Sequence, residues 1–129
     1  MRIIAAVFID TIQLREAPGP STRIDLGGVK FSEVAPSAVP VTVEPHLVVL
    51  VHCPTDHKGE AALEVIYERD GAQVARNVQP LAVEPGKFNY RLVRAELTFD
   101  DYGTIEAHCR IDSGPTTIVP LTLVPPAPD

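Results

Sequence analysis

The chain contains no tryptophan, and its aromatic side chains are three tyrosines and four phenylalanines among 129 residues. A hydrophobic core made from this composition must be mainly aliphatic. Basic residues are also scarce, because 17 acidic residues outnumber 11 basic ones and give a net charge of −6. This charge repels phosphate backbones, and no cluster of basic and stacking aromatic side chains offsets it. The sequence therefore argues against nucleic acid as a partner.

Long apolar runs are missing as well. The stretch Met1–Asp10 has one basic residue and a short apolar run, without the longer apolar region and small-residue cleavage site of a signal peptide. No segment reaches the length of a transmembrane helix. We therefore expect a first β-strand here and no membrane association. We also expect a cytoplasmic protein, in which the two cysteines stay reduced.

What the sequence does contain favours extended structure. Hydrophobic residues make up 45% of the chain, which argues against disorder of the whole, and valine and isoleucine are abundant. Thirteen prolines divide the chain into short pieces and count against long helices. The length fits one domain, which we place at residues 1–124, followed by a short proline-rich tail at 125–129.

Three segments carry the clearest strand signals. Residues 46–53, HLVVLVHC, carry apolar side chains at both odd- and even-numbered positions, as in a central strand covered on both sides. Residues 61–78 contain two strand-like runs around Asp70-Gly71, a dipeptide typical of tight hairpin turns. Residues 103–111 alternate strictly in polarity and lead to a turn at Ser113-Gly114. These signals predict antiparallel pairing of neighbouring strands.

Proline and glycine mark the remaining segments. We interpret residues 15–22, with their Pro-Gly-Pro, as a loop, and residues 23–34 as a strand that contains Gly27-Gly28 at a bulge or a close backbone approach. Residues 35–45 are expected to run extended along a sheet edge. Pro120 places the last strand at a sheet edge or at a bend between sheets.

Together these segments give about seven to nine short strands, with turn signals every 8 to 12 residues and no convincing helix. That pattern predicts an all-β protein, an antiparallel β-sandwich of the immunoglobulin-like type. An open barrel is the alternative architecture.

The segment Asp101–Ala107, DYGTIEA, resembles the D-x-G-x-Y-x-C signature that opens strand F of immunoglobulin-like domains. Ile105 stands where that signature has tyrosine, and Ala107 where it has cysteine. The whole chain also resembles a family of small uncharacterised bacterial immunoglobulin-like proteins, through its aliphatic opening strand, IDLGGV and YGTIEAHCRIDSG. This resemblance implies a fold and a bacterial cytoplasmic setting, and no activity. It would also allow a disulfide between Cys53 and Cys109, out of the usual register.

Histidine and cysteine offer the main candidate for chemistry. Cys53, His57 and Cys109 could bind zinc if the loop residue His57 folds back, with Asp56 or His46 as a fourth ligand. However, neighbours on a strand point to opposite faces, and no C-x-x-C motif is present. We therefore expect two buried thiols beside exposed histidines, with no metal and no cofactor.

Catalytic constellations are weaker still. Cys53 with His57 is the one local pairing that could form a nucleophile and its base, and the serines lack a nucleophile-elbow pattern. Asp100-Asp101 precedes a strand, where aspartates commonly bond to nearby backbone amides. Glu60, Glu64 and Glu68 are interpreted as the solvated face of a strand. The sequence therefore predicts no enzyme and no catalytic residues.

What remains is a binding protein. Residues 46–51 and 116–124 carry more aliphatic surface than one side of a sandwich requires, and any excess left uncovered would mark an interface. The edge expected at 35–45 could pair with another chain. We predict a protein–protein interaction or assembly module that binds a protein partner or forms a homodimer. The alternative is a metal-binding or cysteine-dependent protein centred on Cys53, His57 and Cys109.

Overall fold

A computed structural model describes residues 1–17 and 21–127 of the chain. Within these residues the backbone forms twelve strands and no helix, so no helix could cross a membrane. The count exceeds the predicted seven to nine partly because three strands have only three residues each. The strands are β1 (Arg2–Ile9), β2 (Thr11–Ala17), β3 (Ser21–Gly27), β4 (Ser32–Val34), β5 (Val41–Val43), β6 (His46–His52), β7 (Glu60–Arg69), β8 (Ala72–Ala82), β9 (Phe88–Arg94), β10 (Leu97–Phe99), β11 (Gly103–Ile111) and β12 (Thr117–Val124).

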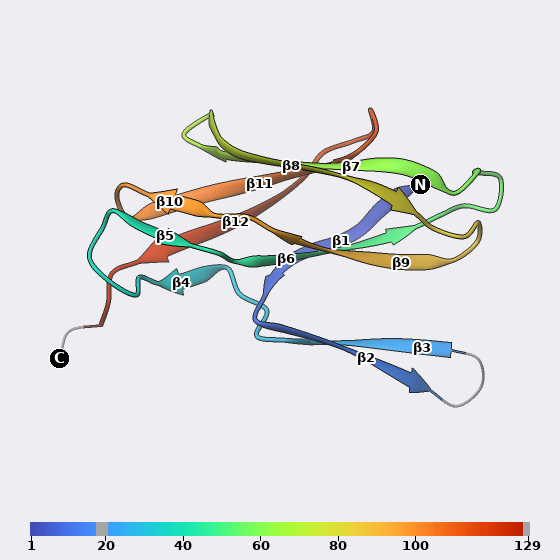
Figure 1. Ribbon diagram of the computed structural model, residues 1–129, viewed down its shortest axis with the longest axis horizontal. Coiled ribbons are helices and arrows are strands. Elements are labelled where there is room, and N and C mark those ends of the chain that lie inside the picture. Colours follow the sequence, from blue (N-terminus) through green and yellow to red (C-terminus); the bar gives the residue numbers. More distant parts are fainter. Residues whose placement is uncertain (18–20, 128–129) are drawn as a thin grey trace.

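The strands form several antiparallel sheets, none of them closed. One sheet has the order β4-β12-β11-β7-β8, with β4 joined to β12 in parallel, and a second has the order β1-β6-β9. Two smaller pairs, β10-β5 and β2-β3, complete the arrangement. The five-stranded and three-stranded sheets face each other, and the β2-β3 hairpin projects from the side of β1-β6-β9 that faces away from the five-stranded sheet (Figure 1). The prediction of an all-β protein is confirmed.

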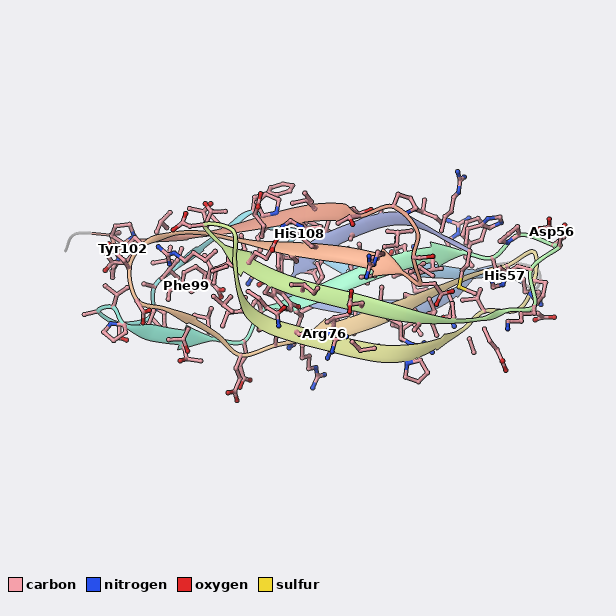
Figure 2. The ribbon with its side chains drawn as sticks, turned by 90° about the horizontal axis from the view of Figure 1, so that it is seen from above. Asp56, His57, Arg76, Phe99, Tyr102 and His108 are labelled. Carbon is pink, nitrogen blue, oxygen red and sulfur yellow. The ribbon has the colours of Figure 1, made fainter. Side chains whose placement is uncertain are left out.

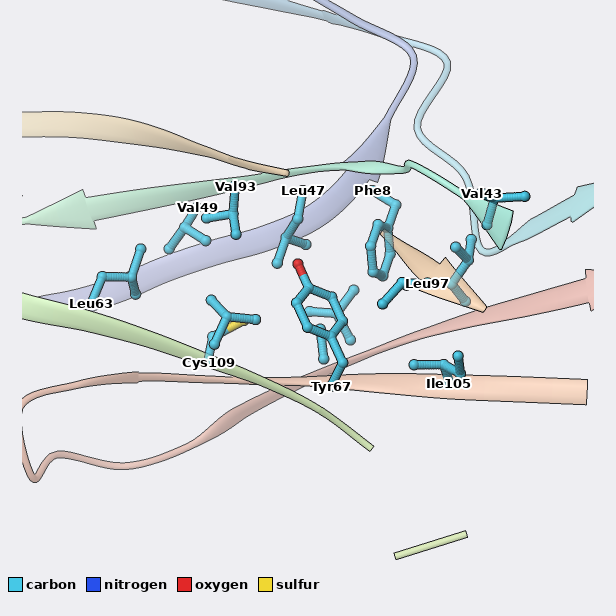
Figure 3. Close-up of a cluster of buried hydrophobic side chains, with 14 of the residues drawn as sticks. Phe8, Val43, Leu47, Val49, Leu63, Tyr67, Val93, Leu97, Ile105 and Cys109 are labelled. Atoms are coloured by element: carbon cyan, nitrogen blue, oxygen red, sulfur yellow. The ribbon is translucent and has the colours of Figure 1, made fainter. Parts of the chain in front are cut away.

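One hydrophobic core lies between the two facing sheets. Side chains from β1, β6 and β9 meet side chains from β7 and β11, and Figure 3 shows them interleaved between the ribbons. The fully buried members include Leu47, Val49 and Val93 on one side and Leu63, Tyr67 and Cys109 on the other. Aliphatic residues dominate this cluster, as the composition requires.

Two predicted hairpins are confirmed. β7 and β8 pair along their length around Asp70-Gly71, whose φ angles of 51° and 82° suit a tight turn between strands. β11 and β12 pair around the turn that contains Ser113-Gly114, with Asp112 at a φ of 49°. Both turns place successive strands side by side in the five-stranded sheet.

The segment predicted to be a central strand is also confirmed. β6 lies between β1 and β9, and Leu47, Val48 and Val49 are all 0% exposed. Leu47 and Val49 belong to the main core, whereas the intervening Val48 points to the other face of the sheet. The β2-β3 hairpin lies on that other side (Figure 1), which accounts for the aliphatic residues on both parities.

Two interpretations of the early segments are wrong. β2 and β3 form an antiparallel pair that extends through most of the predicted 15–22 loop; the Pro-Gly-Pro at its centre lies outside the described residues. The predicted strand at 23–34 is interrupted, because β3 ends at Gly27 and Gly28 adopts a left-handed φ of 65°. The glycine pair does allow a close approach, one of the two predicted alternatives, since a Cβ on Gly28 would meet the Asp10 side chain.

The predicted edge segments have a mixed outcome. Only Val41–Val43 of residues 35–45 is a strand, and it pairs with β10. Pro120 lies opposite Glu106 of β11, while β4 reaches only Thr122–Val124, so β12 has one neighbour at the proline. This local edge tolerates the missing N–H, as the sequence predicted. Residues 125–127 of the predicted tail carry no strand, and 128–129 lie outside the described residues.

Candidate functional site

The β2-β3 hairpin is fixed at its base. The Asp10 N–H donates to the carbonyl oxygens of Gly27 and Gly28 at 3.0 and 3.2 Å, and the Lys30 N–H donates to the Phe8 carbonyl at 2.9 Å. Lys30 Nζ lies 2.8 Å from Asp10 Oδ1 and 3.3 Å from Glu33 Oε1. The hairpin therefore leaves and re-enters the body of the protein through one hydrogen-bonded neck.

The ammonium group at this neck is held in its charged form. Partial burial by itself lowers the pKa of Lys30, but the hydrogen bond to Asp10 and the negative charge of Glu33 outweigh this effect and raise the pKa overall. The lysine thus stays cationic at neutral pH between two carboxylates. This arrangement holds the start of β2 close to the chain that follows β3.

The hairpin is amphipathic, with period-two alternation on both of its strands. The register pairs Ile12 with Leu26 and Leu14 with Ile24, which places four aliphatic side chains on one face. The residues between them lie on the opposite face, where Arg15 Nε and Asp25 Oδ2 form an ion pair at 2.6 Å. The polar face looks toward solvent, and the aliphatic face looks back at the three-stranded sheet.

A groove of about 560 Å³ lies between this aliphatic face and the outer face of β1-β6-β9. Three of its lining side chains remain strongly exposed, with Ile4 at 46%, Leu14 at 51% and Phe88 at 69%. Such exposure is unusual for large apolar side chains that already face one another across a gap. The lining residues are Ile4, Leu14, Ile24, Leu50, Phe88, Asn89 and Tyr90.

The groove suits apolar binding and offers little for catalysis. Its lining includes no carboxylate, histidine, cysteine or cation, and its side-chain polar groups are the Asn89 amide and the Tyr90 hydroxyl. The Asn89 amide is already engaged, because its Nδ2 donates to the Ala82 carbonyl at 3.3 Å and its Oδ1 accepts the Tyr90 N–H at 2.8 Å. A ligand here would be held by burial of apolar surface.

The residues of the predicted metal alternative have other roles. Cys53 and Cys109 are free thiols, each 0% exposed in the core. His57 Nδ1 accepts the Gly59 N–H at 2.9 Å, so this nitrogen stabilises the loop after β6. Among residues 1–17 and 21–127, no three histidine, cysteine or acidic side chains form a group suited to a metal ion. The structure therefore gives this constellation no metal geometry.

Neither thiol is placed for nucleophilic attack. Burial raises the pKa of Cys109 to about 12, so this residue is a neutral thiol at physiological pH. Cys53 Sγ lies 3.6 Å from the Pro54 carbonyl oxygen, a weak contact with its own backbone. Both cysteines pack as small hydrophobic side chains.

Two of the acidic residues singled out in the sequence, Asp101 and Glu64, have structural roles. Asp101 Oδ1 accepts the N–H of Tyr102 at 2.8 Å, which confirms the expected bond to nearby backbone. Glu64 accepts hydrogen bonds from Arg76 and Arg110 across neighbouring strands at 2.8 and 2.9 Å. The hydrogen bond from Arg76 is the main reason that the pKa of Glu64 is lowered. These contacts connect the outer surfaces of β8, β7 and β11.

A histidine cluster beside this network was not anticipated from the sequence. His108 Nε2 lies 2.8 Å from Glu68 Oε2 and 3.4 Å from Glu106 Oε1, on the outer face of the five-stranded sheet (Figure 2). His108 lines a shallow hollow of about 160 Å³, which is also lined by Ile66 and Thr116. Because Glu106 pairs directly with Glu68, one imidazole lies between two adjacent carboxylates.

The β2-β3 hairpin and its groove were not predicted, although the sequence carries a signal for the hairpin. Ile12 and Leu14 alternate with polar residues, as do Ile24 and Leu26, and the pair of runs around a turn dipeptide is the usual signal of a hairpin.

No family model and no curated protein sequence matches this chain.

Proposed function

We propose that this chain is a non-enzymatic, immunoglobulin-like β-sandwich that acts as a protein–protein interaction module. We propose further that the groove between the β2-β3 hairpin and the β1-β6-β9 sheet holds an apolar, extended segment of a partner protein. The observation that carries this proposal is the set of half-exposed aliphatic and aromatic side chains that face each other across a gap of about 560 Å³.

The strand order supports the immunoglobulin-like assignment. The three-stranded sheet β1-β6-β9 faces the five-stranded sheet, in which the order β12-β11-β7-β8 follows β4 (Figure 1). This matches the division of an immunoglobulin domain into an A-B-E layer and a G-F-C layer with an added C′ strand. The short β4, parallel to β12, then corresponds to a first strand that switches sheets.

The chemistry of the groove favours a protein segment over other apolar ligands. A fatty acid or other lipid needs a cation or several hydrogen-bond donors for its head group, whereas the lining has no cation and, beside the engaged Asn89 amide, a single hydroxyl on Tyr90. The volume lies within the range of roughly 300–1,000 Å³ that is usual for specific ligand sites. An extended segment with alternating apolar side chains could present these to the hairpin and the sheet at once.

The non-enzymatic part of the proposal rests on the state of the nucleophiles. Cys109 is buried and has a raised pKa, Cys53 is buried, and His57 is engaged by a backbone amide. A reactive cysteine needs access and a stabilised thiolate. The unpaired state of both thiols also supports a reducing, cytoplasmic setting.

Two charge substitutions on adjacent residues of β2 test the groove. Leu14→Glu places a carboxylate in the groove, whereas Gln13→Glu places the same carboxylate on the solvent face of the same strand. Both positions are exposed, so both variants should keep the fold, which circular dichroism and thermal melting would check. The wild-type protein and both variants are then used as baits in a lysate of the source organism, with quantitative mass spectrometry of the captured proteins.

We expect a partner to be enriched by the wild-type protein and by Gln13→Glu, and to be lost with Leu14→Glu. A synthetic peptide from the captured partner should then bind the wild-type protein and shift the NMR signals of the groove residues. Capture that is equal for all three baits, or no specific capture by any, would contradict the proposed function.

A further inference from the structure

We propose that β8 is a second interaction surface, at which two copies of this chain pair edge to edge. β8 is the longest strand in the described residues, with eleven residues, and it forms one edge of the five-stranded sheet. Figure 2 looks down on that sheet and shows β8 along its outer margin, near the label of Arg76. An edge of this length presents backbone N–H and C=O groups to another strand.

The neighbouring edge, β9, is closed by its own side chains. The Lys87 carbonyl accepts the Cys53 N–H on the side of β6, so the polar groups of Tyr90, three residues later, point outward. Asn89 Oδ1 accepts the Tyr90 N–H at 2.8 Å, and Arg91 Nη1 donates to the Tyr90 carbonyl at 3.2 Å. The edge of the smaller sheet is thus protected against pairing at this point.

Two hydrogen bonds at the end of β8 identify the residues whose backbone N–H and C=O groups point away from β7. The Val83 N–H donates to the Gly59 carbonyl at 2.8 Å, on the side of β7, whereas the Ala82 carbonyl accepts Asn89 Nδ2 on the opposite side. Even-numbered residues from 76 to 82 therefore direct their backbone polar groups outward. Pro80 is one of these residues, so its lack of an N–H removes no hydrogen bond between β8 and β7.

Among residues 1–17 and 21–127, no backbone hydrogen bond joins the outward groups of Arg76 and Val78 to another strand. An antiparallel two-fold axis at Asn77 would place Arg76 opposite Val78 of the second copy, and Val78 opposite its Arg76. Each of these two pairs then exchanges two N–H···O bonds, which gives four new bonds in total. The two five-stranded sheets would join into one continuous sheet.

The side chains of β8 are compatible with this register. Val78 is 48% exposed, so it would gain contact with the stem of the opposing Arg76. The two Arg76 side chains would lie diagonally across the axis, and each is already neutralised by Glu64 of its own chain through Nε and Nη2 at 3.1 and 2.8 Å. A second copy therefore meets valines and paired charges, without an unpaired lysine or carboxylate at the centre.

The other face of β8 adds a polar pair at the axis. Asn77 is half-buried, and its Oδ1 accepts Gln79 Nε2 at 3.1 Å, while its own Nδ2 donates no hydrogen bond within the described residues. In the proposed register the two Asn77 residues are directly opposite each other, so each Nδ2 can donate to the other Oδ1. A polar pair of this kind favours one register over its neighbours.

Disulfide trapping tests the register directly. Directly opposite residues of a non-hydrogen-bonded pair have Cα atoms about 4.5 Å apart, within the range that a disulfide spans. Asn77→Cys should therefore give a covalent dimer under mild oxidation, seen on a non-reducing gel. The matched control is Gln79→Cys, on the same face of β8, whose counterpart lies four residues away across the axis. The native cysteines are buried and should not react.

A charge test at Val78 gives an independent reading by sedimentation equilibrium. Val78→Lys opposes Arg76 of the second copy and should weaken the dimer by roughly 2- to 30-fold, because two symmetric like-charge pairs form. Val78→Glu opposes the same arginine and should leave the dimer as tight or tighter. Ile118→Lys, at 51% exposure on the same sheet but away from β8, should have no effect.

Any of three results would overturn the pairing: a wild-type protein that remains monomeric at millimolar concentration, equal cross-linking of the two cysteine variants, or equal effects of lysine and glutamate at position 78. Circular dichroism of each variant separates these results from unfolding. Because β8 and the groove lie on different sheets, failure of this inference would leave the proposed groove function intact, and the reverse also holds.

Discussion

Replacing Tyr67 by phenylalanine should make the protein more stable. The Tyr67 side chain is 0% exposed in the core between the two facing sheets, and its hydroxyl oxygen has no hydrogen-bond partner. Figure 3 shows that hydroxyl directed across the core toward aliphatic side chains of the opposite sheet. The folded state therefore carries the desolvation of a polar group without compensation, and the substitution removes that group while it keeps the ring.

The expected size of the effect follows from two opposing terms. A buried hydroxyl without a partner costs about 1–3 kcal/mol. Its removal leaves a void of about 10 Å³, which costs about 0.2 kcal/mol at roughly 24 cal/mol per Å³. We therefore expect Tyr67→Phe to raise the free energy of unfolding by about 1–3 kcal/mol, or the melting temperature by about 3–10 °C in a domain of this size.

High pH should enlarge the difference. Burial is the main cause that raises the pKa of Tyr67 above its value of 10.0 in the unfolded chain. The unfolded state then ionises first, so the wild-type protein loses stability as the pH rises above 10, by up to about 1.4 kcal/mol per pH unit. Tyr67→Phe lacks this contribution and should fall less steeply.

Urea denaturation followed by circular dichroism, at pH 7 and above pH 10, measures both effects. Tyr102→Phe is the control, because the Tyr102 side chain is half-buried and, unlike that of Tyr67, does not bury an unpartnered hydroxyl. This substitution should change the free energy of unfolding by less than about 0.5 kcal/mol. If Tyr67→Phe proved less stable than the wild-type protein by 1 kcal/mol or more, the hydroxyl must have a partner, and the reasoning would be refuted.

Three further predictions concern the thiols, the hairpin neck and metal. Burial raises the pKa of Cys109 from 9.0 to about 12, so its thiol should resist alkylation in the native state at pH 7; rapid labelling of native protein by a bulky maleimide would contradict this. For the same reason the free energy of unfolding should fall as the pH rises from about 9 to about 12, because the unfolded chain loses the thiol proton first. Gly28→Ala should destabilise the protein by about 1–3 kcal/mol and increase hydrogen exchange in β2 and β3, because it strains a φ of 65° and presses a Cβ against Asp10; unchanged exchange would count against the neck. Protein purified without chelators should contain no stoichiometric zinc by elemental analysis, and zinc that disappears in Cys53→Ser would restore the metal alternative.

The sequence predicts this fold best where local chemistry determines pairing. Asp70-Gly71 favours positive φ angles, and β7 and β8 pair around it as expected. The apolar run of residues 46–53 becomes a central strand because both of its faces are covered. The same reasoning placed Pro120 at a local edge, where one neighbouring strand is absent.

Prediction failed at the β2-β3 hairpin and at the groove that it forms. The Pro-Gly-Pro segment looked like an ordinary loop, yet β2 and β3 pair up to residues 17 and 21 on either side of it. The groove required knowledge of which sheet the hairpin faces, and a single sequence does not contain that information.

The neck of the hairpin has a consequence for how such a protein can diversify. The chain departs after Asp10 and returns at Gly27, and a hydrogen bond of 3.0 Å joins the two points, so the ends of this hairpin already meet. Insertions at points of this kind are tolerated, since the host fold does not depend on their length. Evolution or a protein engineer could exchange residues 11–26 for another hairpin and so reshape the groove, while the rest of the fold is kept.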